Sequence, residues 1–233
     1  MNTAALTHTG SYIFAESLES HPPLRASDMS NGFITISKQS GSGGSSFARM
    51  LARHLNAEAP AGKTWTVLEG NLAARLLEEC SMPAYLSRFL PEDKTPEPHA
   101  FIGEMIGLHP NIWNLLEKTN QAMREIARRG NVILVGRGAN FATAEIPGGI
   151  HIRLVAPPEK RARYFAQLYD VTEEEARAIN AKRDAATRRY VSANFNANIE
   201  DVRAYNLVLN TSQVQLAEAV GMVSGLLHKR QPI

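Results

Sequence analysis

Cysteine is almost missing from this 233-residue sequence, which contains only Cys80. A single cysteine cannot form a disulfide bond within the chain, so a disulfide-stabilised fold is excluded and a cytoplasmic location is predicted. A catalytic thiol is also disfavoured, because Cys80 ends a helical-looking run at 72–80 that has no histidine close in sequence.

Long apolar runs are absent as well. No stretch approaches the roughly 18 apolar residues that a membrane-spanning helix needs. The first thirty or so residues are polar and lack the basic start and apolar centre of a secretory signal. We therefore expect no membrane partner, and we interpret residues 1–31 as a loosely ordered arm.

Charge of one sign does not dominate either, since 25 Lys and Arg residues and 23 Asp and Glu residues give a net charge of +2. This balance disfavours nucleic acid as a partner and leaves only local basic sites. A nucleic-acid-binding or scaffold role for the basic helices stays open as the weakest of three hypotheses. The composition allows a homo-oligomer without indicating one.

Short β-branched and apolar runs alternate with segments of helical periodicity along residues 32–230. Strands are predicted at 33–37, 65–68, 132–135, 150–155 and 205–209. Helices are predicted after the glycine-rich segment, at 72–80, at 112–129, from Pro158, from a capping box of Thr172 and Glu175, and from Ser212 with Gln215. The alternation predicts an α/β fold in one domain, with a parallel sheet and helices on both faces. Within it, 60–110 is a candidate substrate-binding insertion and 172–198 a helical lid.

The strongest motif is the segment SKQSGSGGSS at 37–46, between the first strand and the next helix. Glycines allow a tight turn and a close approach of the backbone to a ligand, and successive N–H groups at a helix start favour phosphate. We therefore predict an ATP-binding loop in which the hydroxyl of Ser45 or Ser46 binds Mg²⁺, with Ser45 as the first choice. The residues expected to bind ATP are Ser40, Gly41, Ser42, Gly43, Gly44, Ser45 and Ser46.

This loop departs from the usual phosphate-binding loop at both ends. Lys38 stands where the first glycine is expected, and Gly44 stands where the lysine is expected. Phosphoryl transfer needs positive charge at the β- and γ-phosphates, so Lys38 is a candidate catalytic residue that swings back over them. A solvent-exposed Lys38 without function is the competing interpretation.

A nicotinamide dinucleotide fold is the main rival for the same loop. It would require glycine at position 46, where Ser46 stands, and Glu69 could be the acid that follows its second strand. The Tyr-x-x-x-Lys pair of a short-chain dehydrogenase is missing, since no tyrosine has lysine four residues on. The loop therefore favours a kinase over a dehydrogenase.

Downstream arginines could neutralise a transferring phosphoryl group, and three clusters fit: Arg137, Arg161 with Arg163 on the next helix, and those of the capped helix. Arg137 directly follows a predicted strand, so it is expected at the carboxyl edge of the sheet, where ligands bind. Arg183 and Arg188 lie on the capped helix, and Asp184 is four residues from Arg188, so that these two side chains can pair. The remaining helical arginines that we interpret as surface charges are Arg163, Arg177 and Arg189.

Several segments occur together in an order that is typical of one family. They are ITIS and GSGG at 34–37 and 41–44, VGRGAN at 135–140, RLVAPPEKR at 153–161, Asp184 with RRY at 188–190, and YNLVLNTS at 205–212. With these blocks the chain resembles the cytidylate-kinase-like family. The resemblance implies a P-loop nucleoside monophosphate kinase that uses ATP and Mg²⁺, with CMP or dCMP as the first acceptor to test. It also implies that Arg137 and Asp184 bind the acceptor and that Arg183 and Arg188 act from the lid.

The chain also differs from true cytidylate kinases, which keep the loop lysine and carry an acid where Gly138 stands. The segment 60–110 contains no recognisable monophosphate pocket. The main hypothesis is therefore a nucleotide-binding phosphotransferase. The alternative is a catalytically inactive P-loop module that binds nucleotide and has lost the chemistry together with the lysine.

Overall fold

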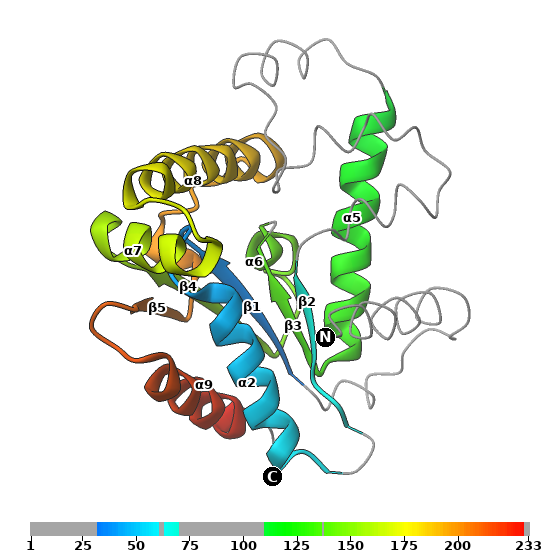
Figure 1. Cartoon of the computed structure of the whole chain (residues 1–233). Coiled ribbons are helices and arrows are strands. Elements are labelled where there is room, and N and C mark those ends of the chain that lie inside the picture. The colour runs from blue at the N-terminus through cyan, green and yellow to red at the C-terminus, as the bar shows by residue number, and fades with distance from the viewer. Residues whose placement is uncertain (1–31, 61–62, 70–109, 137, 231–233) are drawn as a thin grey trace, which may run out of the picture.

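The computed structural model of the protein describes residues 32–60, 63–69, 110–136 and 138–230. These residues form a five-stranded sheet in the order β2-β3-β1-β4-β5, and every neighbouring pair of strands is parallel (Figure 1). The strands are β1 (Phe33–Lys38), β2 (Thr66–Glu69), β3 (Val132–Val135), β4 (Gly149–Val155) and β5 (Leu207–Asn210). The fold is the predicted α/β fold, with the first strand at the centre of the sheet.

Helices cover both faces of this sheet. They are α2 (Gly44–Glu58), α5 (Pro110–Arg129), α6 (Ala139–Ala142), α7 (Pro158–Tyr169), α8 (Glu173–Phe195) and α9 (Leu216–Arg230), with a short 3-10 helix, η3 (Val202–Ala204). One core cluster joins the sheet to α2 and α9, and a second joins its other face to α5, α6 and the end of α8. Helix α7 packs along α8 at the carboxyl end of the central strands (Figure 1).

Side chains alternate between the two faces along β1. Ile34 and Ile36 lie in the cluster under α2 and α9, whereas Phe33 lies in the cluster on the other face. This alternation is the period-2 pattern of a strand that is buried on both sides. Because β3 and β4 flank β1, the loop that follows Lys38 opens at the middle of the sheet's carboxyl edge.

Most predicted elements among the described residues are confirmed within one or two residues, and the start of the last strand and the cap of the last helix differ in detail. The last strand begins at Leu207 rather than at Tyr205, which ends η3 instead. Ser212 does not cap the last helix, because its hydroxyl donates to Asn210 Oδ1 at 2.8 Å. Gln215 precedes α9, and its own N–H donates to the Glu218 carboxylate at 2.9 Å. The predicted arm, the helix at 72–80 with Cys80, and most of the insertion at 60–110 lie outside the described residues.

Helix α8 begins with the predicted capping box. The Thr172 hydroxyl accepts the N–H of Glu175, and the Glu175 carboxylate accepts the N–H of Thr172. At the other end, Asn196 adopts a left-handed conformation with φ of 48° as the C-cap, a role to which asparagine is suited. The asparagine-rich segment after α8 is thus a helix stop. None of the described helices has the length and apolar character needed to cross a bilayer.

Candidate nucleotide site

The glycine-rich loop between β1 and α2 turns through two left-handed residues. Gly41 has a φ of 78° and Gly43 a φ of 82°, a region that side chains rarely adopt. Gly43 is also the N-cap of α2, and no side chain of the described residues caps this helix. The N–H groups of the first turn of α2 thus lie at the partly positive end of a helix without a side-chain acceptor. Such a terminus suits a phosphate group, so the described loop fits the nucleotide that the sequence predicts.

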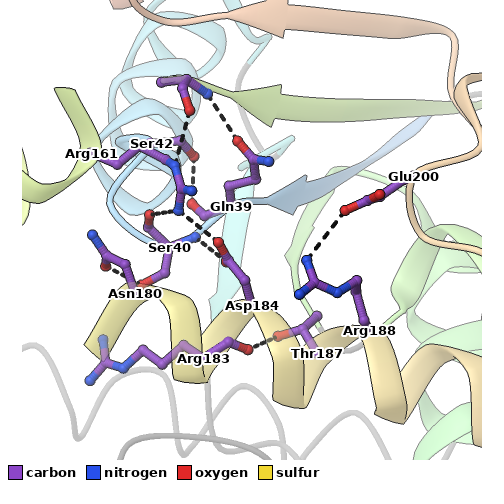
Figure 2. A network of polar contacts seen from close by, with 11 residues as sticks. Gln39, Ser40, Ser42, Arg161, Asn180, Arg183, Asp184, Thr187, Arg188 and Glu200 are labelled. Carbon is purple, nitrogen blue, oxygen red and sulfur yellow. Dashed lines mark hydrogen bonds and ion pairs between the residues drawn. The ribbon is translucent and has the colours of Figure 1, made fainter. Parts of the chain in front are cut away.

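The outer half of the loop is fixed to α7 and α8 (Figure 2). The N–H of Ser40 donates to Asp184 Oδ1 at 2.7 Å, and the Ser40 hydroxyl donates to Asn180 Oδ1 at 2.7 Å. Arg161 of α7 donates to the Ser40 carbonyl at 2.9 Å. The loop is therefore held by two helices that come more than 100 residues later in the chain.

Arg161 and Asp184 form the ion pair at the centre of this network. Arg161 Nη1 lies 2.6 Å from Asp184 Oδ2, and the two side chains are only 10% and 13% exposed. The packing of α7 and α8 against the loop gives position 41 a second reason to be glycine. A Cβ there would lie 2.5 Å from the Arg161 carbonyl oxygen and 2.8 Å from Asn180 Nδ2. The predicted pairing of Asp184 with Arg188 is wrong, because both Asp184 oxygens are engaged by Arg161 and Ser40.

Lys38 lies at the inner end of the loop, against the start of α2. Its Nζ donates to Ser45 Oγ at 3.0 Å and to Glu69 Oε1 at 2.6 Å. A Cβ at Gly44 would lie 2.5 Å from Lys38 Cδ and 2.9 Å from Lys38 Cβ. The Lys38 stem therefore runs directly over Gly44, and its ammonium reaches the first turn of α2 from the strand side.

Glu69 completes this contact from the end of β2. Its carboxylate accepts hydrogen bonds from both Lys38 and Ser45. Burial would raise the pKa of this carboxyl, but the Lys38 charge and the bonds from Lys38 and Ser45 hold the pKa below its usual value. Glu69 is therefore ionised at neutral pH and faces the loop, where it binds Lys38 rather than acting as the acid of a dinucleotide fold.

The two lid arginines face different neighbours. The Arg183 guanidinium lies 5.0 Å from the centre of the Phe165 ring of α7. Arg188 Nη1 lies 3.3 Å from Glu200 Oε1, in a pair whose side chains are about half exposed. Figure 2 shows the two side chains leaving α8 in different directions. Arg137, which was predicted to contact the acceptor, lies outside the described residues.

A buried polar layer lies behind the loop on the α8 side of the sheet. Arg153 of β4 is 6% exposed and donates to Ser37 Oγ at 2.7 Å. It has no carboxylate within 4.0 Å among the described residues, and burial lowers the pKa of its guanidinium. Nearby, Asn140 Nδ2 is buried without a hydrogen-bond partner in the described part of the chain. This layer was not predictable from the sequence, because its members Arg153, Ser37 and Asn140 lie on three separate segments.

The predicted ATP-binding residues, Lys38 and Asp184 are brought together at one edge of the sheet. Three residues of this site were not predicted as such: Glu69 had been considered only for the dinucleotide fold, and Arg161 and Asn180 were not assigned to the loop. Their contacts with Lys38 and Ser40 join residues that are 31 to 140 positions apart. Residue spacing within one element does not predict contacts between residues so far apart in sequence. The strand–loop–helix pattern is local, so it was predictable.

Metal-binding side chains are sparse here. The described residues contain no group of three or more His, Cys, Asp or Glu side chains that could hold an ion. Ser45 and Glu69 nevertheless offer a hydroxyl and a carboxylate side by side. Mg²⁺ in phosphate-binding sites typically takes one or two protein oxygens and completes its shell with phosphate and water. The donor set at Ser45 fits such an ion.

The parallel sheet with a glycine-rich loop after its central strand has the P-loop kinase fold. A sequence model described as the cytidylate kinase-like family matches residues 73–213, more than half of the chain. The chain therefore belongs to the cytidylate kinase-like family.

Individual relatives agree with this family. The cytidylate kinase of Methanocaldococcus jannaschii is 26% identical over 196 residues, which cover 83% of this chain and 96% of that protein. The cytidylate kinase of Methanopyrus kandleri is 29% identical over 188 residues, which cover 77% and 84% of the two chains. The crystal structure of an uncharacterized protein from Eubacterium ventriosum has the same fold, with a TM-score of 0.62, 18% identity, and coverage of 86% and 99%.

Proposed function

We propose that this protein is an ATP-dependent phosphotransferase that phosphorylates a nucleoside monophosphate, with CMP or dCMP as the first acceptors to test. The observation that carries the proposal is the position of Lys38. Its stem runs over Gly44, the position of the usual loop lysine, and its ammonium lies 3.0 Å from Ser45 Oγ at the start of α2. The positive charge that position 44 lacks is thus supplied from position 38.

The proposed roles follow from the contacts around the loop. The N–H groups of the first turn of α2 bind the phosphates of ATP, and Ser45 Oγ holds magnesium. Bound Mg²⁺ would supply charge neutralisation at the β- and γ-phosphates. Lys38 adds a second positive charge there, and Arg183 and Arg188 reach the transferring group when the lid closes. The residues assigned to the acceptor are Arg137 and Asp184.

Asp184 has a double role in this proposal. Its two oxygens hold Ser40 and Arg161, so it orders the phosphate loop before any ligand binds. Each carboxylate oxygen has a further lone pair, and the acceptor can share one of them. Loss of Asp184 is therefore expected to affect ATP binding as well as acceptor binding.

The test is an ADP-release assay over a panel of nucleoside monophosphates, combined with a lysine swap. Lys38→Met should reduce turnover by about tenfold or more, equivalent to roughly 1.4 kcal/mol of transition-state stabilisation, while ATP binding by the backbone N–H groups persists. The double variant Lys38→Gly with Gly44→Lys returns the lysine to its usual position and should recover part of the lost rate. Equal turnover of Lys38→Met and the parent would exclude Lys38 from the chemistry.

The second candidate is an inactive nucleotide-binding module. The observation that favours it is the pairing of Lys38 with Glu69, which neutralises the ammonium in this conformation. Calorimetry with ATP, combined with the ADP-release panel, separates the two candidates. Tight ATP binding without ADP release for any acceptor in the panel would favour the module over the kinase.

A further inference from the structure

The Lys38 ammonium occupies the space between two oxygens that could bind a metal ion. It lies 3.0 Å from Ser45 Oγ and 2.6 Å from Glu69 Oε1, and the Ser45 hydroxyl donates to the same Glu69 oxygen. Hydroxyl and carboxylate oxygens are ligands that Mg²⁺ and Mn²⁺ prefer. A monovalent cation on a flexible stem therefore stands at a position with the donor atoms for a divalent one.

This position is accessible to solvent, and its carboxylate is fixed in place. The Lys38 and Glu69 side chains are 27% and 28% exposed, so water and ions reach the pair. Glu69 is the last residue of β2 and pairs in register with Val135 of β3, which fixes its backbone at the carboxyl edge beside the loop. The carboxylate is thus held next to the phosphate-binding turn by the sheet itself.

We propose that Ser45 and Glu69 together form the divalent-cation pair of this protein, and that the ion displaces the Lys38 ammonium from it toward the β- and γ-phosphates. This inference rests on the proposed function for the use of the freed lysine, but the competition for the two oxygens is independent of it. A divalent ion attracts the carboxylate twice as strongly as an ammonium at the same distance. The partly exposed Lys38–Glu69 pair is correspondingly weak and open to exchange.

The Lys38 ammonium needs to move only a short way for this exchange, because its stem already lies beside the phosphate loop. The stem already lies over Gly44, with Cδ 2.5 Å from the position of a Cβ there. In the proposed exchange the backbone and the stem near Cβ stay in place, and the end of the flexible side chain turns the ammonium from Glu69 toward the loop. Binding of the metal ion and release of Lys38 from Glu69 are therefore one event. When nucleotide binds without a metal ion, Lys38 is still paired with Glu69.

The experiment measures metal binding without nucleotide, with Mn²⁺ alone as the probe and free Mn²⁺ followed by electron paramagnetic resonance. Lys38→Met keeps the apolar stem over Gly44 and removes the competing charge. It should bind Mn²⁺ about fivefold tighter or more than the parent, because the fixed charge beside the two oxygens is gone. Glu69→Gln should lose most of the binding. Lys229→Met, an exposed lysine on the last turn of α9, removes one charge far from the site and is the matched control.

Equal Mn²⁺ affinity of Lys38→Met, Lys229→Met and the parent would overturn the inference, and so would no detectable binding by any of them. Thermal unfolding of each variant checks that the fold is retained. A second measurement is acylation of lysines followed by peptide mass spectrometry. Mn²⁺ should increase the labelling of Lys38 in the parent, and Glu69→Gln should label strongly without metal. None of these measurements requires turnover, so a protein inactive on every acceptor would still give them.

Discussion

Substitution of Asp184 by asparagine tests whether this residue holds the phosphate loop. The side chain keeps its shape but loses its charge, and Arg161 becomes a buried cation without its partner. Removing one member of a buried ion pair costs about 3–5 kcal/mol. The asparagine side chain would retain an oxygen for the Ser40 N–H, so we expect the lower end of that range, about 3 kcal/mol. For a domain of this size that corresponds to a fall in the melting temperature of roughly 6–12 °C.

Urea and thermal unfolding of Asp184→Asn measure this loss, and Glu200→Gln provides the matched control. Glu200 also pairs with an arginine, but that pair is about half exposed, so its removal should change the free energy of unfolding by less than about 0.5 kcal/mol. The double variant of Asp184→Asn with Arg161→Met should cost less than the sum of the single variants, because the second change removes the stranded charge.

The outcome separates two roles for Asp184. If Asp184→Asn unfolds like the parent but binds the monophosphate acceptor more weakly, the residue acts on the substrate and the reasoning from the buried pair is refuted. If the variant is destabilised and also binds ATP more weakly, with the acceptor absent, Asp184 orders the loop. Calorimetric titration with ATP alone distinguishes these results.

Three further predictions follow from other parts of the site and the fold. Burial and the Arg230 charge lower the pKa of His151 to about 4 from 6.5. The unfolded chain therefore binds this proton at a higher pH than the folded protein does, and the free energy of unfolding should fall as pH drops from 6.5 to 4, by at most about 3–4 kcal/mol. In urea unfolding at several pH values, the free energy of unfolding of His151→Gln should change less with pH than that of the parent. Gly44→Ala should displace the Lys38 stem, because a Cβ there would lie 2.5 Å from Lys38 Cδ and 2.9 Å from Lys38 Cβ. We expect lower turnover and a lower melting temperature, since the clash outweighs the gain in helix propensity; retained turnover would contradict the proposed path of Lys38. Saturating ATP should slow the amide hydrogen exchange of residues 185–198, measured by mass spectrometry. Residues 176–184 should be protected even without ATP, because Asn180 and Asp184 are hydrogen-bonded to the loop. Equal exchange of residues 185–198 with and without ATP would contradict the assignment of this segment as a lid.

The sequence predicts the central strand, the loop and the following helix because each has a local signal. A β-branched run, a glycine-rich turn and an apolar stripe of period 3.6 occur in succession from residue 33 to 55. The capping box at Thr172 is equally local, and the helix begins as predicted. The start of the last strand has a weaker signal, since Tyr205 and Asn206 have strand-like neighbours but belong to the turn after η3.

The partners of charged side chains were not predictable in the same way. Helical spacing allowed Asp184 to pair with Arg188, whereas the folded chain supplies Arg161 from the neighbouring helix α7. An i,i+4 pair on an exposed face contributes only about 0.5 kcal/mol. A buried carboxylate that accepts from the Ser40 N–H and the Arg161 guanidinium is a stronger constraint. The tertiary arrangement therefore decides the pairing, and the sequence does not contain it as a spacing.

Positions 38 and 44 are likewise coupled through tertiary contact rather than through sequence spacing. Taken alone, Gly44 indicates a loop that has lost its lysine, and Lys38 indicates a surface charge. In the folded protein the absence of a side chain at position 44 is what allows the Lys38 stem to lie there, with contacts that any Cβ would block at 2.5 Å. A lysine at both positions would compete for one space, and a glycine at both would leave Glu69 without its cation. Lys38 and Gly44 are thus structurally coupled. The double variant Lys38→Gly with Gly44→Lys is therefore the change at these positions that the loop should tolerate best.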